Sequence, residues 1–85
     1  MAKWMLKAKE FGLITFKESD GRLTQSKKGD IFIVETLWNN NPTPQDVAKS
    51  VGKEWAGNYG SIPNKGYTKV GEQVVSSSWE VTRLE

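Results

Sequence analysis

The 85-residue sequence contains neither cysteine nor histidine, and each absence removes a class of chemistry. Without cysteine the chain has no disulfides and no thiolate metal ligands, which fits the reducing cytoplasm. Without histidine it lacks the commonest general base and the commonest metal ligand. Ser-His and Cys-His catalytic pairs are therefore excluded, and the carboxylates are scattered along the chain. We predict a protein that is not an enzyme and has no metal site.

Long hydrophobic runs are also missing from the chain. No segment has the length of a membrane-spanning helix, and the first residues do not resemble a secretory signal peptide. The glycines do not form a phosphate-binding loop, because residues 57–60 follow the predicted helix instead of leading into it. The sequence therefore predicts a cytoplasmic protein with no membrane contact and no cofactor. Its length predicts a single domain, residues 1–85.

Charge is distributed unevenly along the sequence. Residues 1–28 carry seven basic and three acidic side chains, a net charge of +4, whereas residues 29–85 carry five basic and seven acidic ones, a net charge of −2. This asymmetry would guide an anionic partner to the N-terminal part. The alternative interpretation is a solvated strand face on which lysines protect a sheet edge from aggregation.

The first third of the chain is typical of strands joined by tight turns. Trp4, Leu6 and Ala8 alternate with lysines and predict a half-buried strand near a sheet edge. Residues 11–16 either continue this strand past a bend or form a second one. The Asp-Gly pair at residues 20–21 predicts a hairpin turn before a short return strand over residues 23–25. We expect these segments to form an antiparallel meander.

Residues 30–38, DIFIVETLW, form the most apolar segment and are predicted to be the central strand, buried on both faces. Thr43 and Pro44 then predict the start of a helix over residues 44–56. Its apolar stripe of Val47, Val51 and Trp55 should cover the sheet.

The remaining segments complete the predicted fold. Residues 79–84 predict a closing strand beside the central one, and residues 67–75 are read either as a strand or as a loop. The fold class is α+β: a small, mainly antiparallel, twisted sheet of four or five strands, with one helix packed on one face.

Binding is the remaining class of function, and a protein partner is the first version of it. Tyr59 and Ile62 lie in the loop over residues 57–66 without an obvious core partner, as interface residues often do. The alternative is that both side chains tuck under the loop and complete the core.

Nucleic acid is the second version of the binding hypothesis. Trp4, Phe11 and Phe16 are interleaved with cations in the N-terminal part, and stacking plus positive charge suits a single strand on a β surface. The candidate cations are Lys3, Lys7, Lys9, Lys17, Arg22, Lys27 and Lys28. A structural or self-assembling subunit is the third hypothesis.

Short segments of the chain resemble the small phage-encoded inhibitor of bacterial RNA polymerase of T7-type phages. The resemblance lies in VETL at residues 34–37 ahead of a helix carrying Ala48 and Trp55, and in EVTR at residues 80–83 behind an aromatic residue. It implies the order strand, strand, helix, strand. This chain would then carry insertions over residues 12–30 and within residues 57–78.

The resemblance also implies a phage origin, a host protein as target and a role for arginines of the closing strand in holding the polymerase. Arg83 stands at the first of those arginine positions, and Glu80 belongs to the same motif. Glu85 stands where the second arginine would be, which reverses the charge. With the loop residues Tyr59 and Ile62 named above, the predicted partner-binding residues are Arg83, Glu80, Tyr59 and Ile62.

Overall fold

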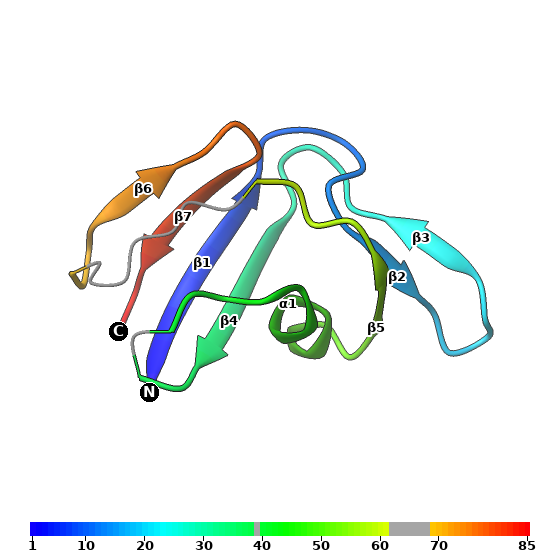
Figure 1. Ribbon diagram of the computed structural model, residues 1–85, viewed down its shortest axis with the longest axis horizontal. Helices are drawn as coiled ribbons and strands as arrows, with labels where there is room; N and C mark the ends of the chain where they lie inside the picture. The colour runs from blue at the N-terminus through cyan, green and yellow to red at the C-terminus, as the bar shows by residue number, and fades with distance from the viewer. Residues whose placement is uncertain (39, 62–68) are drawn as a thin grey trace.

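The computed structural model describes residues 1–38, 40–61 and 69–85, and within these ranges the chain forms seven strands and one helix (Figure 1). In chain order these are β1 (Ala2–Ala8), β2 (Thr15–Lys17), β3 (Leu23–Gln25), β4 (Ile31–Thr36), α1 (Pro44–Ser50), β5 (Glu54–Gly57), β6 (Gln73–Val75) and β7 (Trp79–Arg83). The predicted α+β class is confirmed. The strands are divided between two antiparallel sheets.

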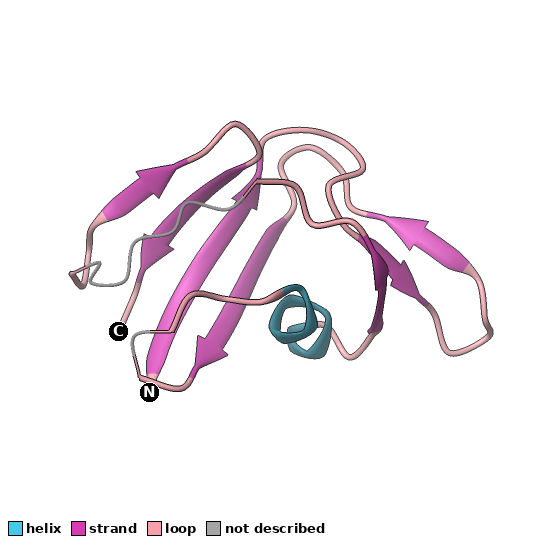
Figure 2. Ribbon diagram, in the orientation of Figure 1, coloured by secondary structure: helices cyan, strands magenta, loops and turns pink. Residues whose placement is uncertain are grey.

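The strand order of the sheets corrects four predictions (Figure 2). The first sheet has the order β4-β1-β7-β6 and the second the order β3-β2-β5. The predicted central strand β4 is therefore an edge strand, whereas β1, predicted near an edge, lies inside the first sheet. The closing strand β7 pairs with β1 and β6 instead of β4. The hairpin of β2 and β3 is confirmed, but β1 pairs with neither, so there is no N-terminal meander.

β4 is buried on one face only, which is the physical reason for the first correction. Phe32, Val34 and Thr36 point into the core, while Ile31 and Ile33 are 54% and 45% exposed. Side chains of a strand alternate between faces, so a run of four consecutive apolar residues, 31–34, looks the same in the sequence whether the second face is covered or open.

The helix begins at Pro44, as predicted, and ends at Ser50, six residues before the predicted end. Thr43 Oγ1 accepts a hydrogen bond from the Asp46 amide at 3.2 Å, and Asp46 Oδ2 accepts one from the Thr43 amide at 3.0 Å, which completes a capping box. Gly52 has φ +69° and takes the chain out of the helix. Trp55 consequently lies in β5, and the buried helix residues are Val47 and Ala48.

One hydrophobic core joins the two sheets. α1 lies beside β4, between the first sheet and β5 (Figure 1). The ring of Phe16 on β2 lies 5.9 Å from that of Phe32 on β4, which lies 6.0 Å from the Trp79 ring on β7. Trp4 and Leu6 of β1 complete the buried centre, as their alternation predicted.

Two segments for which the sequence allowed two interpretations form strands over part of their length. Residues 11–16 contribute β2, which begins at Thr15, and Gly12 has φ +77° in the turn before it. Of residues 67–75, Gln73–Val75 forms β6, while Tyr67 and Thr68 lie outside the described residues. None of the described helical residues form a helix long enough to cross a membrane.

Candidate functional site

The outer face of the first sheet, opposite the core, carries two complete rows of side chains. Residues that pair across antiparallel strands share a face, so the strand register defines each row. The first row is Ile31, Lys7, Glu80 and Val75, and the second row is Ile33, Met5, Thr82 and Gln73. A third, shorter row pairs Lys3 with Glu35.

This outer face is more apolar than a solvent-facing sheet surface requires. Ile31, Ile33 and Val75 are 54%, 45% and 53% exposed, and Met5 lies between Ile33 and Thr82. The first row has one cation, Lys7, beside one anion, Glu80, at its centre. The face therefore combines apolar contact area with an ordered charge pattern.

Beyond the end of β4, the chain exposes its most accessible aromatic side chain among the described residues. Trp38 is 81% exposed and has φ 54°, in the left-handed region that bulky residues rarely adopt. Trp38 lies in a turn, and the Asn40 amide donates a 3.1 Å hydrogen bond to the Leu37 carbonyl. The backbone strain at such a position is about 1–2 kcal/mol.

The base of the Trp38 turn is fixed to the core by two linked hydrogen bonds. The Trp4 indole Nε1 donates to Thr36 Oγ1 at 2.8 Å, and Thr36 Oγ1 donates to the Asn40 carbonyl at 2.9 Å. Trp4 and Thr36 are both buried. These bonds anchor the backbone on both sides of Trp38, while its side chain lies in solvent.

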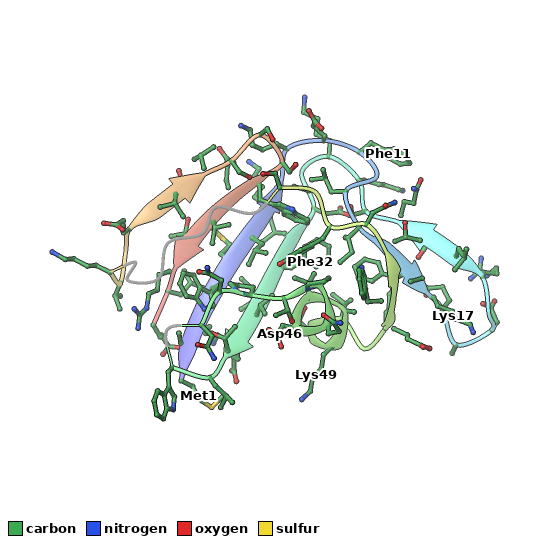
Figure 3. The ribbon with its side chains drawn as sticks, in the orientation of Figure 1. Met1, Phe11, Lys17, Phe32, Asp46 and Lys49 are labelled. Carbon is green, nitrogen blue, oxygen red and sulfur yellow. The ribbon has the colours of Figure 1, made fainter. Side chains whose placement is uncertain are left out.

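Met1 extends the apolar surface around this end of the sheet. It is exposed and lines a shallow depression of about 360 Å³ between β4 and the outer side of α1, together with Ile33, Glu35, Asp46, Lys49 and Ser50. Figure 3 shows Met1 at the end of β1, with Asp46 and Lys49 on the neighbouring helix.

The cations predicted to bind nucleic acid are dispersed over both sheets. Lys7, Lys9 and Lys28 line one depression of about 600 Å³ with Glu80, but Lys9 Nζ donates to the Ser76 carbonyl at 2.9 Å. Lys3 contacts Glu85 at 3.7 Å at the far end of β1, and Arg22 pairs with Asp20 at 2.7 Å. Lys17 lies on β2, and Lys27 lies in the turn before β4.

Two of the three aromatic residues predicted to stack on nucleic-acid bases are buried. Trp4 and Phe16 are buried in the core and present no face to a base, while Phe11 is exposed. Because stacking supplies much of the affinity of single-strand binding, cations alone make a weaker surface.

The four residues predicted to bind a protein partner do not form one cluster. Glu80 belongs to the outer face, whereas Arg83 pairs with Trp4 on the opposite face. The Arg83 guanidinium lies 5.8 Å from the centre of the Trp4 ring, and its Nε donates to the Glu85 carbonyl at 3.0 Å. Ile62 lies outside the described residues.

Tyr59 completes the core, which is the alternative that the sequence left open. Its ring lies 5.7 Å from that of Trp79, and its hydroxyl donates to the Pro42 carbonyl at 3.1 Å. The Trp79 indole donates in return to the Tyr59 carbonyl at 2.6 Å. Burial, aided by the negative charge of Asp46, raises the pKa of the Tyr59 phenol above its usual value.

A depression of about 720 Å³ beside the second sheet is lined by the ion pair of Glu18 and Lys53. Glu18 accepts a hydrogen bond from Thr24 at 2.7 Å and pairs with Lys53 Nζ at 3.0 Å. These two interactions lower the pKa of the Glu18 carboxyl. This carboxylate and ammonium therefore satisfy each other beside the second sheet. Across the described ranges, no three Asp or Glu side chains converge as a metal site would require.

Trp38 is not among the predicted site residues, because the apolar pattern of residues 30–38 predicts one buried strand. The signal that marks the turn is the run of three asparagines and a proline that follows this tryptophan. Comparison with protein-family models, curated proteins and solved structures finds no match to this chain.

Proposed function

We propose that the protein is a non-catalytic protein-binding module that uses Trp38 as its anchor residue. The observation that carries the proposal is an 81% exposed tryptophan at φ 54° in a turn that is hydrogen-bonded to the core. Strained backbone and exposed aromatic rings both concentrate at recognition sites. A fixed turn also reduces the entropy that is lost when the anchor binds.

The partner should offer an apolar socket for one indole ring. Leu37 follows β4 and Met1 precedes β1, and both are exposed. They extend the apolar area around Trp38. Tryptophan side chains that enter such pockets are among the largest single contributors to binding at protein interfaces.

Capture of a partner from a bacterial lysate by the immobilised full-length protein tests this proposal. Wild type and Trp38→Asn are compared with Leu23→Asn, a matched control that removes an exposed apolar residue from β3 on the second sheet. We expect wild type and Leu23→Asn to retain one stoichiometric partner and Trp38→Asn to bind it about thirtyfold more weakly. A partner retained equally by Trp38→Asn would contradict the anchor role.

Bacterial RNA polymerase is the specific partner to test first, because of the resemblance to the phage inhibitor. In support, β1, β4, α1 and β7 keep the implied order, with β2 and β3 inside the first implied insertion and β6 inside the second. β5, which carries Trp55, lies between α1 and β7 and has no counterpart in that order. With purified polymerase, Arg83→Glu should abolish capture, and the exposed control Arg22→Glu should not. Unchanged capture by Arg83→Glu would remove the closing-strand contact that the resemblance implies.

A further inference from the structure

We propose that a second copy of this chain packs face to face on the outer face of the first sheet, forming a symmetric dimer. The face is defined by the two complete rows given above. Its exposed isoleucines and valine lie on the side of the sheet opposite the core, and the register fixes their positions relative to the charges. Two sheets that pack face to face lie about 10 Å apart with nearly aligned strands.

The charge pattern of the first row fits a two-fold axis that runs along the strands midway between β1 and β7. This axis places β1 opposite β7 of the second copy and β4 opposite β6, while each row stays opposite itself. Lys7 then faces Glu80 of the second copy, and Glu80 faces its Lys7.

The same axis brings apolar residues together at the ends of the first row and places apolar opposite polar residues in the second row. Ile31 faces Val75 of the second copy, which brings two exposed apolar side chains together. In the second row, Met5 faces Thr82 and Ile33 faces Gln73. No charge on either row is buried against an apolar residue, so the arrangement avoids the desolvation penalty of an unpaired charge.

The same pattern disfavours the other simple two-fold arrangement. An axis across the strands at the second row would place Lys7 opposite Lys3 of the second copy and Ile31 opposite Glu35. Like charges in contact and an apolar residue against a carboxylate are both unfavourable. The axis along the strands instead gives an alternating square of two lysines and two glutamates.

The size of the face predicts a reversible dimer. Four strands spaced about 4.8 Å apart give a patch at the small end of specific interfaces. Sedimentation velocity of the full chain from micromolar to millimolar concentration should therefore show a monomer that converts to a dimer. A monomer over the whole range would overturn the proposal.

Single substitutions test which face is used. Lys7→Glu and Ile31→Lys should each weaken dimerisation at least tenfold, because each creates repulsion or an unpaired charge in the first row. Lys17→Glu is the matched control, since it makes the same charge change at an exposed position of β2 on the second sheet and should leave the dimer unchanged. Equal dimerisation of Lys7→Glu and wild type would reject this face.

A charge exchange tests the axis without disturbing the fold. The double variant Lys7→Glu/Glu80→Lys keeps the opposite-charge pair within each chain, and its own dimer has the inverted but equivalent pattern. It should self-associate as wild type does. Mixed with wild type, it would place like charges opposite each other at both positions, so native mass spectrometry should show at least fivefold fewer heterodimers than random mixing gives. Random mixing would overturn the proposed axis.

The dimer proposal and the Trp38 anchor proposal can be disproved independently of each other. Trp38 lies in the turn beyond β4 and belongs to neither row, so Trp38→Asn should leave dimerisation unchanged. Conversely, Lys7→Glu should still capture the lysate partner.

Discussion

The indole of Trp4 and the hydroxyl of Thr36 form a buried 2.8 Å hydrogen bond that joins β1 to β4 near one end of the first sheet. The same hydroxyl donates to the Asn40 carbonyl at 2.9 Å, so one oxygen connects the core to the turn that carries Trp38. Thr36 thereby contributes to stability through Trp4 and to the position of the proposed anchor through Asn40.

Replacing Thr36 by valine should destabilise the fold by about 1–3 kcal/mol, because the shape is retained but the buried Trp4 Nε1 loses its acceptor. Urea unfolding measures the difference. The control is Thr82→Val, whose hydroxyl accepts an exposed 3.1 Å hydrogen bond from Gln73, and its effect should stay within about 0.5 kcal/mol. Equal effects of the two substitutions would show that the Thr36 hydroxyl does not support the core.

Replacing Trp38 by asparagine should stabilise the protein while weakening partner binding. Asparagine adopts positive φ more readily than tryptophan, so the strain at φ 54° is reduced and the free energy of unfolding should rise by about 1 kcal/mol. Thermal unfolding measures the gain.

Leu37→Asn is the control for this gain, since Leu37 is also an exposed apolar residue but does not have a positive φ. It should bring no comparable stabilisation. If Trp38→Asn proves no more stable than wild type, the turn does not strain the tryptophan, and backbone strain does not support an anchor role for Trp38.

Local patterns in the sequence predicted the features that depend on neighbouring residues. The alternation of Trp4 and Leu6 with lysines gave β1 its buried face, Thr43 marked the helix start, and the Asp-Gly pair marked the hairpin of β2 and β3. Each of these features is determined within about eight residues, where capping and turn chemistry act.

Features that depend on distant contacts were not predictable in the same way. Ile31 and Ile33 favour a strand equally well at the edge and at the centre of a sheet, so only strand pairing decides which face stays open. Val51 and Trp55 have helical spacing, yet Gly52 ends the helix. Trp55 lies on β5 and packs, partly buried, against the core. The positive φ of Trp38 had no residue-type signal, because tryptophan is not a turn residue.

Tyr59 should make the stability of the protein depend on pH in the alkaline range. Its pKa is raised in the folded state by burial and by Asp46, while in the unfolded chain it is about 10. The folded protein therefore holds the phenolic proton more tightly than the unfolded chain. This contribution to stability is fully present below pH 10 and is lost as the pH rises above 10, where the unfolded chain releases the proton.

Tyr59→Phe isolates this effect, because every other residue is the same in the two proteins. At pH 8 the variant should be less stable by about 1 kcal/mol, since it lacks the 3.1 Å hydrogen bond to the Pro42 carbonyl. Between pH 9 and 11 the stability of wild type should fall more steeply, so the difference between the two proteins should shrink and then reverse. Urea unfolding at half-unit pH intervals measures it. A difference that stays constant from pH 8 to pH 11 would mean that the phenol is solvated in the folded protein, contrary to its packing against Trp79.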